Sequence, residues 1–172
     1  MLWFSSDNGP ENGTPGTTGG YRERKRSLYE GGVRVPGLLE WPAMIKKHRI
    51  TDLPCSSSDH FPTVMDVLGY QRKGQPEPVD GVSLLPLIKG EMTQRPVPIG
   101  FQSQSQRSLT DNRYKLYSLD NGSTYELYDL IDDPYEENDI AAANETIVNS
   151  MKSTLETWID SCTNSNAGND YI

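Results

Sequence analysis

The sequence lacks any long hydrophobic run and has little positive charge. None of its apolar stretches approaches the ~20 residues that a membrane-spanning helix requires, and its first residues lack the basic segment of a signal peptide. The 172 residues include 16 Lys and Arg against 24 Asp and Glu, for a net charge of −8. Nucleic acids and anionic membranes both attract basic surfaces. We therefore expect neither nucleic acid nor a membrane as a partner.

Cysteine is also scarce, which excludes a disulfide framework. Cys55 and Cys162 match no metal-binding spacing. Two separate thiols are the simpler interpretation, and a single disulfide is the alternative. Acceptor sequences for N-glycosylation occur at Asn12, Asn121 and Asn144. They are compatible with secretion, but such matches arise easily by chance in a chain rich in Asn, Ser and Thr.

The N-terminal stretch combines a short apolar run with a polar pair. Residues 2–4 (LWF) are typical of a strand that is buried on both faces. The run ends at Asp7 and Asn8, and residues 9–20 form a Gly- and Pro-rich loop without periodicity. The polar pair is therefore expected at the end of a strand.

The middle of the chain predicts a further strand and one clear helix. Residues 33–41 follow a Gly-Gly turn and favour a strand that Pro36 bends or breaks. The stretch SSSDHFPTVMDVLGY, residues 56–70, favours a helix capped by Ser58 or Asp59. The apolar residues of this helix share one face: Phe61, Val64, Met65 and Leu68. The stretch DGVSLLPLIKG predicts a shorter helical or looped segment, interrupted by its proline.

The character of the sequence changes near residue 98. Residues 97–130 contain three strand-like runs separated by turn signals, typical of an antiparallel meander. A helix is expected around residues 145–161 and would cover the meander. Its apolar stripe is Ile147, Met151, Leu155, Trp158 and Ile159. We predict three parts: an α/β portion at 1–98, the small sheet with its helix at 99–162, and a polar tail at 163–172.

Asp7 and Asn8 are the first candidates for chemistry. Their carboxylate and amide oxygens are hard ligands that suit Ca²⁺ or Mg²⁺. A position just beyond a buried parallel strand is where open α/β sheets carry their sites. Asp-Asn-Gly is also a common turn, however, and two ligands cannot complete a Ca²⁺ site, which takes about 6–8 oxygens. Spacing alone leaves both interpretations open.

Lys25 is the second candidate, within a short basic cluster of an acidic chain. It suits either a solvated face or a point contact with a sulfate or phosphate oxygen. Arg34 is expected to form a structural ion pair, His48 to be exposed, and His60 to pack or cap. The acidic stretch DLIDDPYEEND lacks the ligand pattern of a Ca²⁺-binding loop and is expected to be a solvated turn.

Five stretches together resemble a known family. In order they are SSDNGPE, KRSLYEGGVRVPGLLEWP, SSSDHFPTVMDVLGY, DGVSLLPLIKG, and NRYKLYSL with YELYDLIDDPYEENDIA. They cover the chain from Leu2 to about Trp158 and resemble the C-terminal part of a sulfatase, in the alkaline phosphatase superfamily. Within the family, SDNGPE and YEGGVRVP favour members similar to arylsulfatases or N-acetylgalactosamine-6-sulfatases. The resemblance implies an α/β fold, the C-terminal portion of the sulfatase fold, followed by a small antiparallel sheet packed by a C-terminal helix.

The resemblance also implies a mechanism and residue roles. Sulfatases hydrolyse sulfate esters with a formylglycine nucleophile and a divalent cation, usually Ca²⁺. Asp7 and Asn8 match the second pair of metal ligands, and Lys25 matches the sulfate-binding lysine that neutralises charge in the transition state. Neither Cys55 nor Cys162 lies in the C-x-P-x-R motif that yields formylglycine. Formylglycine and the N-terminal metal ligands are therefore absent from this chain.

These departures predict a truncated sulfatase that is inactive alone. The alternative is a non-catalytic binding or assembly module, which self-associates or pairs with a missing N-terminal half through an exposed strand edge. A phosphoryl-transfer relative is a weaker third interpretation. Members of the family are commonly periplasmic, secreted or lysosomal, but because no signal peptide is predicted the sequence leaves localisation unknown.

Overall fold

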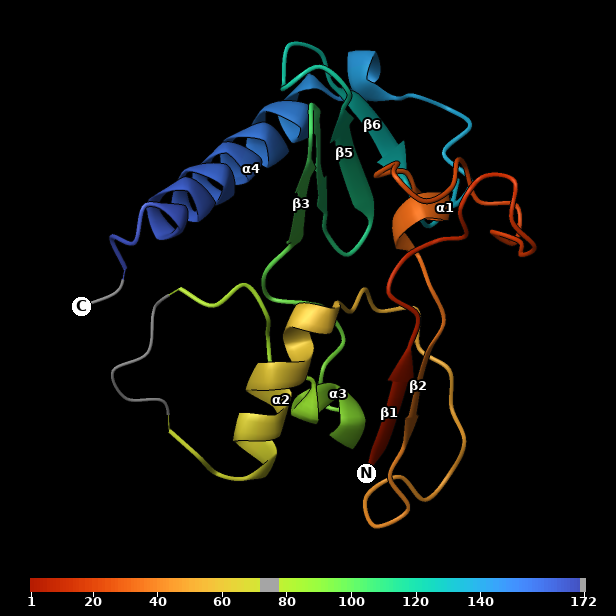
Figure 1. Ribbon diagram of the computed structural model, residues 1–172, viewed down its shortest axis with the longest axis vertical. Coiled ribbons are helices and arrows are strands. Elements are labelled where there is room, and N and C mark those ends of the chain that lie inside the picture. The colour runs from red at the N-terminus through yellow and green to blue at the C-terminus, as the bar shows by residue number, and fades with distance from the viewer. Residues whose placement is uncertain (72–77, 171–172) are drawn as a thin grey trace.

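The computed structural model describes residues 1–71 and 78–170 (Figure 1). Two sheets and several helices are present. The strands are β1 (Leu2–Ser5), β2 (Gly37–Glu40), β3 (Ile99–Ser103), β4 (Gln106–Thr110), β5 (Tyr114–Ser118) and β6 (Glu126–Asp129). The helices are α1 (Glu30–Val33), α2 (His60–Val67), α3 (Leu85–Lys89) and α4 (Glu145–Asn166), with 3₁₀ turns at Ser57–Asp59 and Ala141–Ala143. The predicted α/β class with a small antiparallel sheet and a C-terminal helix is confirmed.

The four-stranded sheet carries the main core. Its order is β3-β4-β5-β6, antiparallel throughout, and α4 lies across one face (Figure 1). The core residues between them are Leu109, Leu116, Leu127, Met151, Leu155 and Ile159. The opposite face is covered by the segment that enters α1, whose Leu28 and Tyr29 pack on Tyr117 and Tyr128. The helix predicted at 145–161 is confirmed, although it continues to Asn166 into the expected polar tail.

The sheet has four strands where three runs were predicted. The extra turn lies between β3 and β4, where Gln104 adopts a positive φ of 55°. Turns with a positive φ are usually marked in a sequence by Gly, Asn or Asp, the residues that most readily adopt this backbone conformation. The stretch FQSQSQRSL contains no Gly, Asn, Asp or Pro, so its hairpin carries no turn signal and the two strands look like one run.

The burial of a core side chain predicts how much stability is lost when that side chain is made smaller. Replacing Ile159, which is 9% exposed against the sheet, by valine should lower the free energy of unfolding by about 1 kcal/mol, because one buried methylene is lost. The matched control is Ile131→Val, where the side chain is 63% exposed and the expected change is below about 0.5 kcal/mol. Urea denaturation of the two variants measures the difference, and equal midpoints would contradict the packing of α4.

The strand β1 is not buried on both faces, so that prediction is wrong for this chain. Among the described residues it pairs with β2 alone, antiparallel, with Leu2 opposite Glu40. Leu2 and Phe4 are 64% and 56% exposed, and Leu38 of β2 is 65% exposed. A two-stranded ribbon has little to cover its faces. The face of β1 that carries Leu2 and Phe4 therefore meets solvent, whereas Trp3 is half-buried.

The strand predicted at residues 33–41 is shorter than expected. Val33 closes α1, where the backbone N–H of Arg34 donates to the carbonyl of Glu30 at 2.7 Å. The strand β2 begins only after Pro36, which has no N–H to contribute to a ladder. Pro36 therefore breaks the run, one of the outcomes that its position allowed.

The helix predicted within residues 56–70 is present as α2, but its surroundings differ. Asp59 occupies the N-cap position of α2, one of the two predicted caps, although its side chain makes no capping bond there. Ser56 caps the preceding 3₁₀ turn and forms a capping box with Asp59. The predicted apolar stripe faces solvent, since Phe61 is 51% exposed. The residues of this exposed α2 stripe are Phe61, Val64 and Leu68. The following segment is helical as α3, with its proline in the first turn.

Two smaller predictions are also resolved. Cys55 and Cys162 are separate free thiols, as the simpler interpretation held. His48 is exposed, and His60 packs on the ring of Trp3 with 4.1 Å between centroids. Within residues 1–71 and 78–170, no helix is both long and apolar enough to cross a membrane.

Candidate functional site

The Asp7–Asn8 pair lies in a loop directly after β1. Asp7 is exposed and Asn8 is half-buried. The backbone N–H of Asn8 donates to the Asp7 carboxylate at 3.0 Å, and the hydroxyl of Ser6 donates to the carbonyl of Asn8 at 3.3 Å. These short-range bonds form a turn at the strand end. The predicted position beyond a strand is confirmed, although that strand is antiparallel to its neighbour and exposed.

Glycine packing holds this loop against α1. The N–H of Gly9 donates to the carbonyl of Gly32 at 2.9 Å. A Cβ atom on Gly9 would lie 1.9 Å from the carbonyl oxygen of Gly31, far inside any allowed contact. A Cβ on Gly31 would in turn lie 2.1 Å from the carbonyl oxygen of Glu23. We predicted a turn at Gly31 and Gly32; their additional role is to let three backbone segments approach closely.

Lys25 lies on one of these segments. Its backbone N–H donates to the carbonyl of Pro10 at 3.1 Å, and the lysine is exposed. The structure therefore places the segment of Lys25 beside the loop that carries Asp7 and Asn8. The neighbouring Arg26 forms an ion pair with Glu11 at 3.0 Å, which further ties the two segments together.

As a metal site, this loop is incomplete. Asp7 and Asn8 offer oxygen donors of the kind that Ca²⁺ prefers. In residues 1–71 and 78–170, however, no group of three or more His, Cys, Asp or Glu side chains is placed to hold a metal ion. Ca²⁺ takes about 6–8 oxygens, so the donors of this chain suit the ion in kind but not in number.

A buried charge cluster holds α1 against strand β5 of the four-stranded sheet. The ammonium of Lys115 lies 3.0 Å from a carboxylate oxygen of both Glu30 and Glu136. Glu136 also accepts the backbone N–H of Glu30 at 2.7 Å. Burial raises the pKa of Glu136, while the charge of Lys115 opposes that shift. Arg34 lies 3.5 Å from Glu30, which confirms its predicted role as a structural ion-pairing residue.

Glu136 corrects the prediction for the acidic stretch DLIDDPYEEND. A solvated turn was expected, yet Glu136 is fully buried, and Asp139 accepts the backbone N–H of Leu127 at 3.0 Å. The residues that pair with Glu136 are distant in sequence. Local composition alone could not reveal this partnership.

An aromatic network joins the loop before α1 to the sheet. The guanidinium of Arg22 donates to the hydroxyl of Tyr128 at 2.8 Å and lies 3.9 Å from the ring centre of Tyr29. Both tyrosine hydroxyls donate to Glu126, at 2.5 and 2.6 Å. Burial and then these bonds raise the pKa of Tyr29 and Tyr128, and burial raises the pKa of Tyr117 to about 12. The hydroxyls are thus kept as donors.

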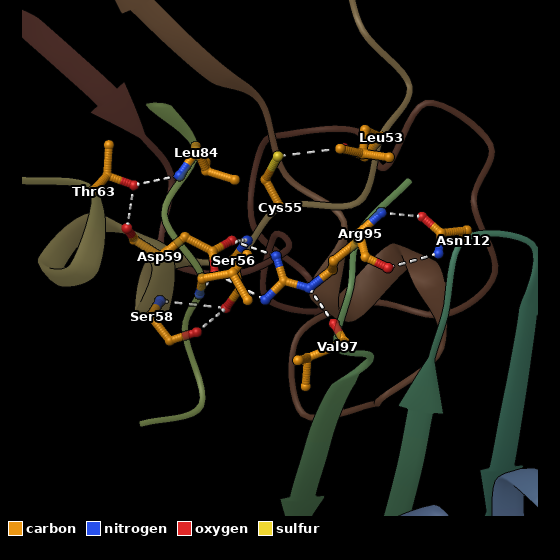
Figure 2. Close-up of polar contacts among 11 residues, drawn as sticks. Leu53, Cys55, Ser56, Ser58, Asp59, Thr63, Leu84, Arg95, Val97 and Asn112 are labelled. Carbon is orange, nitrogen blue, oxygen red and sulfur yellow. Dashed lines mark hydrogen bonds and ion pairs between the residues drawn. The ribbon is translucent and has the colours of Figure 1, made fainter. Parts of the chain in front are cut away.

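A second buried ion pair joins α2 to the sheet (Figure 2). Arg95 contacts Asp59 through two bonds, of 2.7 and 2.8 Å, and both side chains are almost fully buried. Asp59 also accepts the backbone N–H groups of Ser56 and Val82. Asn112 exchanges two hydrogen bonds with the backbone of Arg95. Sequence reasoning considered Asp59 only as a helix cap and missed Arg95.

Comparison with known proteins shows the family to which this chain belongs. The family model described as "N-sulphoglucosamine sulphohydrolase, C-terminal" matches residues 19–161. Human steryl-sulfatase is 40% identical over 76 residues, which are 44% of this chain and 13% of that protein. A sulfatase of Formosa agariphila is 28% identical over 188 residues, covering 92% of this chain and 32% of that protein.

Solved structures agree with the sequence relatives. The crystal structure of Ps i-CgsB superimposes with a TM-score of 0.80 at 25% identity, over 91% of this chain and 35% of that one. The Bacteroides thetaiotaomicron protein BT33336S-sulf gives a TM-score of 0.69 at 26% identity, over 91% of this chain and 38% of that one. The fold is thus a portion of the alkaline phosphatase fold. The chain belongs to the sulfatase family, and it spans about a third or less of the length of these relatives.

Proposed function

We propose that this chain supplies the C-terminal side of a sulfatase active site and that the assembled enzyme hydrolyses sulfate esters. The observation that carries the proposal is the close packing of the Asp7–Asn8 loop against the Lys25 segment, through Gly9, on a fold shared with sulfatases. The segments that carry the oxygen ligands and the ammonium group thereby lie side by side. Family membership supports the reaction class.

The three site residues have distinct proposed roles. Asp7 and Asn8 contribute side-chain oxygens to a divalent cation, with Ca²⁺ as the family expectation. Such a cation supplies Lewis-acid stabilisation of the sulfate oxygens when it is bound. Lys25 binds a sulfate oxygen as a compact point charge and stabilises the negative charge that develops during hydrolysis. The remaining metal ligands and the formylglycine nucleophile come from outside these 172 residues.

The exposed apolar surface supports a partner for this chain. Leu2, Phe4 and Leu38 on the β1–β2 ribbon are more than half exposed, as is Leu68 of the exposed α2 stripe. Apolar surface gathered in this way marks an interaction site. We propose that the remaining part of a sulfatase covers it, since relatives are about three times as long as the region they share with this chain.

Self-association is a second candidate function, favoured by the same surface. The ribbon β1–β2 also has two outer edges that are unpaired within the described residues. Light scattering of the purified chain separates the two cases. A concentration-dependent dimer would favour the assembly module, and a monomer at all concentrations would contradict it.

The chain alone is predicted to be inactive. Incubation of the purified 172-residue protein with an aryl sulfate and Ca²⁺ should release no phenol above the background rate, because nucleophile and half of the metal ligands are absent. Turnover that disappears in the Lys25→Ala variant would overturn this prediction, since it would show a complete site within the chain.

Completion of the enzyme tests the proposed roles directly. Co-expression with the portion of the Formosa agariphila sulfatase that this chain does not match should restore turnover in a complex confirmed by light scattering. Lys25→Ala should then lower kcat by about 10²–10³-fold, the usual effect of removing one group that stabilises transition-state charge. Lys152→Ala, at a half-buried lysine on α4 that pairs with Glu156, is the control and should leave kcat unchanged. Equal rates for both variants would contradict the role of Lys25.

A further inference from the structure

One hollow of the molecule brings four basic side chains together. It has a volume of about 560 Å³ and lies between the loop after β2 and the end of α3. The basic lining residues are Lys46, Lys47, Arg49 and Lys89, and the rest of the lining comprises His48, the carboxylate Glu91 and three apolar side chains. In a chain with 16 basic and 24 acidic residues, this gathers four of the basic residues at one place. We call it the basic pocket.

The basic pocket is built by contacts between two elements. The guanidinium of Arg49 donates to the carbonyl of Leu87 at 2.8 Å and to that of Ile88. It thereby holds the loop after β2 on the C-terminal end of α3, where partial negative charge favours a cation. Lys46 donates to the carbonyl of Pro42 at 2.9 Å, which fixes the start of the same loop.

The salt bridges of the described residues leave the cations of the basic pocket unpaired. Within residues 1–71 and 78–170, no Lys or Arg of the pocket forms an ion pair with an acidic side chain. Lys47 and Lys89 are exposed. Their ammonium groups are therefore open to solvent. At physiological ionic strength, acidic groups more than about 8 Å away are largely screened and do little to cancel this positive charge.

The basic pocket lies away from the proposed catalytic residues. Asp7 follows the end of β1, where Ser5 pairs with Gly37, whereas the pocket loop follows Glu40, which pairs with Leu2 at the opposite end. Figure 1 shows that loop at the end of the ribbon where the N-terminus lies. Four-residue strands span roughly 13 Å. A ligand in the pocket is thus separate from a sulfate ester at Lys25.

We infer that the basic pocket binds a second sulfated unit of a polymeric substrate, a sulfated polysaccharide. The inference rests on the proposed function, because a sulfate ester hydrolase meets such anions. Exposed ammonium groups suit repeated sulfate groups, and a sulfated polymer carries such groups along its whole length. Two linked contacts raise the effective concentration of the chain end at the reacting site.

Binding of dextran sulfate to the purified 172-residue protein tests this inference. We expect calorimetry at low ionic strength to detect binding of dextran sulfate and none of neutral dextran. The Lys47→Gln/Lys89→Gln variant should bind about threefold to twentyfold more weakly, as two exposed charge contacts are lost. Both side chains are exposed, so the fold should persist, which circular dichroism checks. Lys152→Gln, at a half-buried lysine on α4 away from the pocket, is the control and should bind like the parent.

The remaining outcomes distinguish this inference from the proposed function. Unchanged affinity in the double variant would overturn the basic pocket as the binding site. Equal affinity for duplex DNA or for phosphatidylserine vesicles would overturn its assignment to sulfated polysaccharide. Lys25→Gln should leave most dextran sulfate binding intact; loss of binding in that variant alone would place the polymer at the Asp7 loop. Failure of Lys25 to affect turnover in the completed enzyme would reject the proposed function and leave the binding result standing.

Discussion

Asp59→Ala is expected to lower the free energy of unfolding by about 3–5 kcal/mol. The carboxylate forms two hydrogen bonds with Arg95 at 2.7 and 2.8 Å, and the two side chains are 0% and 1% exposed. Removing it leaves a guanidinium charge buried without its partner. It also leaves the backbone N–H groups of Ser56 and Val82 without their acceptor. Urea denaturation followed by circular dichroism measures the loss.

Two variants give this prediction its controls. Glu156→Ala removes an exposed carboxylate 3.8 Å from Lys152 and should cost less than about 0.5 kcal/mol. The double variant Asp59→Ala/Arg95→Met removes both buried charges, so it should recover part of the stability that Asp59→Ala loses. If Asp59→Ala proved as mild as Glu156→Ala, the ion pair would not join α2 to the sheet as the structure indicates.

Gly31→Ala is expected to destabilise the protein by about 3 kcal/mol, the upper end of the usual cost of overpacking. The added Cβ would lie 2.1, 2.4 and 2.7 Å from the carbonyl oxygens of Glu23, Arg22 and Tyr21. These are backbone atoms, which cannot move aside as a flexible side chain can. The segments that carry Asp7 and Lys25 would be forced apart, because Gly9 packs on the same residue. Thermal unfolding monitored by circular dichroism should show a clearly lower Tm.

Gly37 provides a matched control for this effect. A Cβ on Gly37 would meet no atom within 4 Å, and its φ is not among the positive values. Gly37→Ala should therefore be neutral or slightly stabilising, since it reduces the freedom of the unfolded chain. A Gly31→Ala protein as stable as Gly37→Ala would contradict the close backbone approach on which the candidate site depends.

Much of the fold was predictable because the relevant interactions are local. The stripe of α4 and the alternation in β5 and β6 reflect single elements with one covered face, so periodicity located both. The capped start of α2 and the break at Pro36 are likewise backbone effects within a few residues. The hairpin at Gln104 was missed because its turn residues carry no local signal.

The candidate site was predictable only in part. Asp7, Asn8 and Lys25 were identified through the family resemblance of their surrounding motifs, and their roles remain proposals. Spacing could not show that the Lys25 segment lies beside the Asp7 loop, because that contact depends on three glycines packed between separate segments. Arg95 and Glu136 were missed for the same reason. Each is a charged residue whose buried partner is distant in the sequence.

The sequence by itself determined the family, the sheet with its covering helix, and the loop after the first strand. These follow from motifs and periodicities that act within short stretches of chain. Only the tertiary structure decided which charges are buried, that the glycines of the EGG stretch serve close backbone packing, and that the apolar faces of β1 and α2 meet solvent. Burial and long-range pairing are properties of elements brought together, and no single segment encodes them.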